Sequence, residues 1–112
     1  LESGISVGMD SCSAQKTRLA YKDLSNYKNI DQCVEPCEST LYSTYINHSG
    51  IFFPCSFSEG IEYAPGDWKN GISVLDCDDF LKDVWFNSKT KVFSDEVREC
   101  RKCGKSCPIF EI

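Results

Sequence analysis

The stretch that decides the fold is Cys37-Glu38-Ser39-Thr40-Leu41-Tyr42-Ser43-Thr44-Tyr45-Ile46-Asn47-His48-Ser49-Gly50-Ile51-Phe52-Phe53-Pro54-Cys55. Residues 41–46 are rich in aromatic and β-branched side chains, which favour a strand. Residues 47–50 supply turn chemistry, because glycine takes positive φ without steric cost. Residues 51–53 form the return strand, and Pro54 should end the pairing because it has no N–H to donate. The stretch therefore predicts a β-hairpin that brings Cys37 and Cys55 to one side of a common site.

Cysteine spacing favours a metal site over a set of disulfides. The 112-residue chain contains eight cysteines, Cys12, Cys33, Cys37, Cys55, Cys77, Cys100, Cys103 and Cys107. Three residues separate Cys33 from Cys37, two separate Cys100 from Cys103, and three separate Cys103 from Cys107. Thiols this close together can face one centre, as zinc and iron–sulfur ligands do. Disulfides more often close longer loops.

The same stretch resembles the cysteine signature of SPASM and Twitch domains, the auxiliary iron–sulfur domains of radical SAM enzymes. Twelve residues separate Cys37 from Gly50, and four separate Gly50 from Cys55. Further likeness lies in Glu-Pro-Cys-Glu-Ser (35–39), Phe-Pro-Cys-Ser-Phe (53–57) and the closing Cys-Gly-Lys-Ser-Cys-Pro-Ile-Phe (103–110). Beginning at Asp-Ser-Cys-Ser-Ala (10–14), the resemblance covers nearly the whole chain.

The resemblance implies one [4Fe–4S] cluster, which takes four cysteine ligands. The expected ligands are Cys37, Cys55, Cys107 and Cys12, and the alternatives for the fourth place are Cys103, Cys33 and Cys100. One cluster is expected because the tail has three cysteines with none after them, fewer than the two-cluster signature contains. Cys77 is expected to be a small core residue. Zinc bound by the same four thiolates is the chemical alternative.

The chain lacks the motif with which radical SAM enzymes bind their catalytic cluster, a cysteine followed by three residues, a cysteine, two residues and a cysteine. Cys33 and Cys37 have the first spacing, but Thr40 occupies the third position. The isolated chain is therefore not expected to be an enzyme. The resemblance implies an auxiliary domain joined to a radical SAM core in the same polypeptide, supporting peptide or protein substrate binding or electron transfer. Two alternatives are a zinc-stabilised interaction domain and a secreted disulfide-rich binding module.

The expected fold is α+β, a small single domain over residues 1–112 and a piece of a longer protein. It should contain the hairpin, two or three short helices, and Cys-rich loops around a metal cluster. Helices are predicted over 14–24 with Ser13 as the cap, from Asp76 or Asp78 through Trp85, and from Ser88 towards Cys100 with Val92, Phe93 and Val97 on one face. A short strand over 5–9, a polar loop over 25–32 and an irregular loop over 56–73 anchored by Trp68 complete the expected order.

Charge and hydropathy exclude several partners. The net charge of −5 disfavours nucleic acid and anionic membranes. No apolar run approaches the roughly 18 residues that a membrane span needs. The first residues lack the basic and apolar parts of a signal peptide, so a cytoplasmic location is expected. The single histidine, His48, is expected to be a solvated turn residue.

Overall fold

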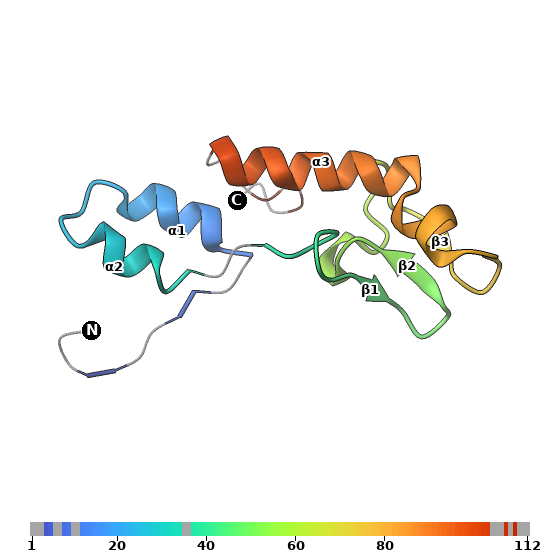
Figure 1. The fold of residues 1–112 in the computed structure, drawn as a ribbon, viewed down its shortest axis with the longest axis horizontal. Helices are drawn as coiled ribbons and strands as arrows, with labels where there is room; N and C mark the ends of the chain where they lie inside the picture. The colour runs from blue at the N-terminus through green and yellow to red at the C-terminus, as the bar shows by residue number, and fades with distance from the viewer. Residues whose placement is uncertain are drawn as a thin grey trace.

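The computed structural model describes residues 4–5, 8–9, 12–34, 37–103, 107 and 109 of the chain, without the side chains of residues 14, 15 and 101–103. Within these residues the chain is a small α+β fold built on a three-stranded antiparallel sheet, as predicted. Figure 1 shows helix α3 (Ser88–Cys103) across the top of the view, above strands β1 and β2, with the helices α1 and α2 set apart at the left. We call residues 12–34 the arm, and residues 37–103 the body.

The sheet confirms the hairpin and adds a third strand. Strand β1 (Tyr45–Ile46) pairs with β2 (Ile51–Phe53), and β2 pairs with β3 (Ile72–Ser73), in the order β1-β2-β3. The registers are Tyr45↔Phe53 and Ile51↔Ser73. Gly50 takes φ 73°, and the side-chain oxygen of Asn47 accepts a hydrogen bond from the N–H of Ile51 at 3.0 Å. The hairpin turn therefore forms where the sequence placed it, and β2 ends before Pro54 as expected.

Two predictions around the hairpin need correction. The first strand does not begin at Leu41, because the carbonyl oxygen of Glu38 accepts bonds from the N–H groups of Leu41, Tyr42 and Ser43 and folds residues 38–43 into a turn. The segment 56–73 is not wholly irregular, because it contains a 3₁₀ turn, η1 (Ser56–Ser58), and strand β3. A two-residue strand carries too little periodicity to be found in a sequence.

The arm differs from prediction in both halves. Helix α1 (Ala14–Tyr21) follows Ser13 as predicted but ends before residue 24. Helix α2 (Tyr27–Asp31) lies where a loop was predicted. The Arg18 side chain joins the two helices by an ion pair with Asp31, with 2.7 Å between Nε and Oδ1. Of the expected strand over 5–9, Met9 forms an isolated parallel bridge with Val34, and residues 6 and 7 lie outside the described part.

The two predicted C-terminal helices are present in altered form. The first is a single π-helical turn, η2 (Leu81–Trp85), and the second is α3. The cap of α3 is Asn87 rather than Ser88, because the Asn87 side-chain oxygen accepts a bond from the N–H of Lys89 at 2.9 Å. Val92 is 52% exposed and not on the buried face. Phe93, Val97 and Cys100 form that face, because positions i, i+4 and i+7 share one side of a helix.

Aromatic side chains between the sheet and α3 form the centre of the core. Trp68 is fully buried, as predicted, and its indole N–H donates to the carbonyl oxygen of Pro65 at 2.8 Å. Its ring centroid lies 5.9 Å from that of Phe52 and 6.4 Å from that of Phe93. Trp68 therefore joins β2 to α3, which fixes the position of the segments that carry the cysteines.

The chain is elongated, with principal extents of 52 × 26 × 22 Å. Its radius of gyration is 16.2 Å, whereas a compact domain of this length has about 13 Å. The difference arises because the arm extends away from the body (Figure 1). Among the described helices, none has the length and apolar character required to cross a bilayer.

Candidate metal centre

Five cysteines line one cavity of about 380 Å³ in the body. They are Cys12, Cys37, Cys55, Cys100 and Cys107, and each belongs to a different segment of the chain. The four expected ligands are all among them, together with Cys100, which was one of the alternatives. Apolar side chains from α3 and the tail, Phe93, Val97 and Ile109, complete the inner wall.

The hairpin positions Cys37 and Cys55 at the cavity. The hydroxyl of Ser39 donates to the carbonyl oxygen of Pro54 at 2.6 Å, and the hydroxyl of Thr44 donates to that of Phe53 at 2.8 Å. These bonds fasten the segment after Cys37 to the segment before Cys55. They also commit the two hydroxyls to backbone carbonyls, which leaves thiols and the Glu38 carboxylate as the metal-binding side chains that line the cavity.

Backbone N–H groups point at two of the thiols. The Cys107 sulfur accepts a hydrogen bond from the N–H of Ile109 at 3.4 Å. At Cys55, burial raises the pKa of the thiol above its ordinary value of 9.0, while bonds from the N–H groups of Phe57 and Ser58 lower it. Cys107 is near enough to raise the pKa of Cys55 further. At Cys55 the effect of burial is larger than that of these hydrogen bonds, so the net pKa is raised and the protonated thiol is favoured.

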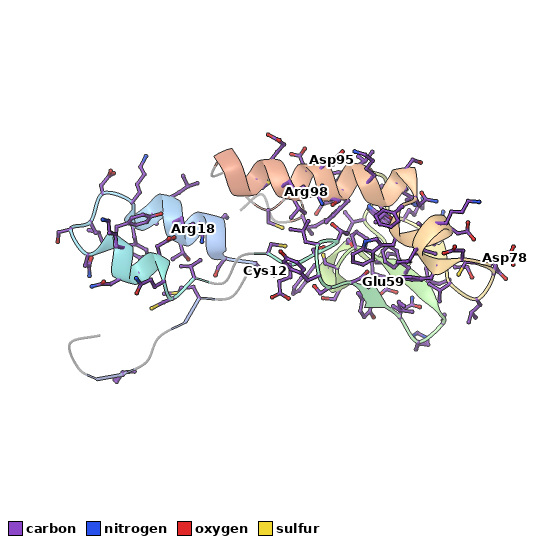
Figure 2. All side chains as sticks on the ribbon, viewed as in Figure 1. Cys12, Arg18, Glu59, Asp78, Asp95 and Arg98 are labelled. Atoms are coloured by element: carbon purple, nitrogen blue, oxygen red, sulfur yellow. The ribbon has the colours of Figure 1, made fainter. Side chains whose placement is uncertain are left out.

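Helix α3 presents Cys100 to the same cavity, and the start of the arm presents Cys12. Cys100 is 5% exposed because it lies on the buried face with Phe93 and Val97. Cys12 is exposed, and Figure 2 shows it at the junction between the arm and the body. These two cysteines of the cavity therefore differ in their access to solvent, since Cys100 is buried and Cys12 is exposed.

Cys33 and Cys77, whose side chains are described, do not line the cavity. Cys33 lies in the arm, where its thiol donates to the carbonyl oxygen of Asn29 at 3.4 Å. The thiol of Cys77 donates to the carbonyl oxygen of Val74 at 3.1 Å, and its side chain packs against the core. Cys103 ends α3, and its side chain is outside the described part. Cys77 is therefore partly buried against the core, and it lies before η2 rather than being a fully buried residue at the start of a helix.

The thiols share a cavity but do not form a finished metal-binding geometry. Among the side chains that the structure describes, which exclude that of Cys103, no group of three or more Cys, His, Asp or Glu is close enough to hold a metal ion. Cys55 and Cys107 carry free thiols. To bind one metal ion these thiols would have to move closer together than in the structure described, as happens at sites where metal binding and folding are coupled.

Sequence reasoning did not single out Glu38 or Tyr45, which also line the cavity. Burial and, to a smaller extent, the Glu59 carboxylate raise the pKa of the Tyr45 hydroxyl above 10.0. Tyr45 could have been found from the alternation of inward- and outward-facing residues along a strand, because the next residue in β1, Ile46, is exposed. No signal identifies Glu38 except its place beside Cys37.

Compared with protein-family models, curated proteins and solved structures, the chain matches none of them.

Proposed function

We propose that this chain is an auxiliary [4Fe–4S] domain, whose cluster is held by Cys37, Cys55 and Cys107 with Cys12 as the fourth ligand. The observation that carries the proposal is the gathering of five cysteines from five separate segments around one cavity. Four ligands from several segments are what a cubane cluster requires. Cys100 is the competing fourth ligand.

The surroundings of the thiols support an iron–sulfur site. Phe93, Val97 and Ile109 give the cavity an apolar inner wall, and backbone N–H groups bond the sulfurs of Cys55 and Cys107. Burial, together with hydrogen bonds to sulfur, sets the potential of such clusters. When bound, the cluster would supply one-electron transfer, and the hairpin and α3 would hold it at a fixed place in the fold.

The proposed context is a radical SAM core in the same polypeptide, with a peptide or protein as its substrate. The resemblance of Cys37, Gly50 and Cys55 to the SPASM and Twitch signature supports this context. The domain would then support substrate binding or accept an electron rather than perform the first chemical step. A site that binds zinc through the same thiols would instead serve only to stabilise the fold.

The test is anaerobic reconstitution with iron and sulfide, followed by measurement of iron, sulfide and zinc per chain. We expect about four irons and four sulfides and a broad visible absorption band. The variants Cys37→Ser, Cys55→Ser and Cys107→Ser should lose most of the iron, whereas Cys33→Ser and Cys77→Ser are matched controls that should keep it. Equal loss in Cys77→Ser and Cys55→Ser would refute the ligand set, and one tightly bound zinc without iron would establish the structural role.

Comparison of Cys12→Ser with Cys100→Ser assigns the fourth ligand. If Cys12 binds the cluster, its variant loses iron and Cys100→Ser retains it. The reverse result would move the ligand onto α3. Far-ultraviolet circular dichroism of each metal-free variant separates a lost ligand from a lost fold.

A further inference from the structure

A second cavity, of about 320 Å³, lies beside α3 and shares no lining residue with the cysteine cavity. It is lined by Thr40, Trp85, Phe86, Lys91, Ser94, Asp95 and Arg98. The last four belong to one face of α3, because they stand at i, i+3, i+4 and i+7. Figure 2 shows Asp95 and Arg98 close together along this helix.

Two costly backbone conformations border this cavity. Thr40 has φ 57° and is 5% exposed, although a β-branched residue rarely takes the left-handed conformation. Trp85 ends η2, a π-helical turn, and Phe86 follows it. Strained residues and π turns are concentrated at functional sites, where the surrounding structure maintains them. Their meeting at one cavity indicates a binding site.

The polar groups of the cavity fit a single negative charge. Lys91 is paired with Asp95, with 2.5 Å between Nζ and Oδ2. Among the described residues, Arg98 forms no ion pair and the indole N–H of Trp85 has no hydrogen-bond partner. The cavity therefore offers the Arg98 cation without an ion-pair partner and the Trp85 indole N–H as an unused donor. A guanidinium binds carboxylate oxygens in pairs, which makes a carboxylate the matching group.

The apolar surroundings indicate that this carboxylate belongs to a peptide. Phe86, which lines the cavity, is 70% exposed, and Leu81, which begins η2 and is not part of the lining, is 58% exposed. An apolar side chain beside the carboxylate would cover part of this surface. A polyanion is disfavoured by the net charge of −5 and by the Asp95 carboxylate in the wall.

We propose that the cavity formed by Thr40, η2 and α3 binds the carboxylate of a peptide, with Arg98 and Trp85 as its donors and Phe86 against its apolar neighbour. This inference rests on different residues from the metal site and does not depend on a bound cluster. The carboxylate can come from an internal Asp or Glu side chain or from the C-terminus of the peptide.

The test follows the two indole N–H signals of the ¹⁵N-labelled full chain during titration with short N-acetylated peptides. The first peptide has an internal Glu next to Leu and an amidated C-terminus. The second ends in Leu with a free C-terminal carboxylate and contains no acidic residue. The third is an uncharged control, in which Gln replaces the Glu of the first peptide and the C-terminus is amidated. At least one carboxylate peptide should shift the Trp85 signal. Trp68, whose N–H is bonded to Pro65, should stay constant. The first two peptides identify the source of the carboxylate.

Substitutions in the cavity are expected to weaken peptide binding in one case and to strengthen it in another. Arg98→Gln should weaken peptide binding by about tenfold or more, because it removes a charged hydrogen-bonding partner. Asp95→Asn should strengthen it, because it removes a repulsive charge and releases Lys91, and misfolding cannot produce such a gain. Lys82→Gln, which removes an exposed cation from η2 outside the cavity, should change little. The proposal is overturned by equal binding of the Gln peptide, by unchanged affinity in Arg98→Gln, or by tighter binding of inorganic phosphate than of either carboxylate peptide.

Discussion

Gly71 offers a sharp test of the sheet, because a methyl group there meets backbone as well as side chains. It takes φ 62° just before β3, opposite the end of β2. A Cβ built on Gly71 would stand 2.7 Å from the carbonyl oxygen of Phe52 and 2.8 Å from Cε1 of Phe53, and would also contact Cγ2 of Ile51. The Ile51 side chain can rotate away, but the Phe52 carbonyl is held in the sheet.

Gly60 is the matched control for Gly71→Ala. It has φ 76°, and a Cβ there would meet nothing within 4 Å. Gly60→Ala should therefore lower the free energy of unfolding only by the left-handed strain, about 1–2 kcal/mol. Gly71→Ala should add an overpacking cost of about 1–3 kcal/mol. Replacing glycine by alanine also lowers the conformational entropy of the unfolded chain, which stabilises the folded state. This effect is common to both substitutions and cancels in the difference between them.

Urea unfolding of both metal-free variants, followed by circular dichroism, measures this difference. We expect Gly71→Ala to unfold at the lower urea concentration with an unchanged slope. Because β2 leads directly to Cys55, the same variant should bind less metal than Gly60→Ala after reconstitution. Equal losses of stability in the two variants would show that Gly71 does not pack against β2 in the way described.

Two further predictions concern the core and pH. Phe52→Ala should lower the free energy of unfolding by about 3–5 kcal/mol because the ring is fully buried, whereas Phe86→Ala should change it by about 0.5 kcal/mol or less. Similar effects in urea unfolding would contradict the core assignment. The folded protein holds the Tyr45 proton to higher pH than the unfolded chain does, so stability should fall as pH rises above 10.0. Tyr45→Phe should reduce that fall relative to the unmodified chain, and identical pH profiles would refute the assignment.

The hairpin and the general class of the fold were accessible from local sequence. Turn residues 47–50 lie between two short apolar runs, and Pro54 marks the end of the second. These signals act over a few residues and need no tertiary context. The buried face of α3 was partly visible for the same reason. Val92 was wrongly assigned to the buried face because Val92 and Phe93 are adjacent apolar residues. Such a pair does not determine which side of the helix faces the core until the packing partner is known.

Sequence alone predicted that Cys37 and Cys55 approach one another, because local turn chemistry pairs the strands that lie between them. The structure shows that a separate turn over residues 38–43 and the bond from the Ser39 hydroxyl to Pro54 bring Cys37 to that side. The sequence also selected Cys12 and Cys107 by resemblance. Only the tertiary structure placed Cys100 in the same cavity and Cys33 in the arm, because those positions depend on how α3 packs on Trp68 and where the arm lies. Strand β3 and the second cavity likewise depend on contacts between residues far apart in the chain, which no local pattern of residues records.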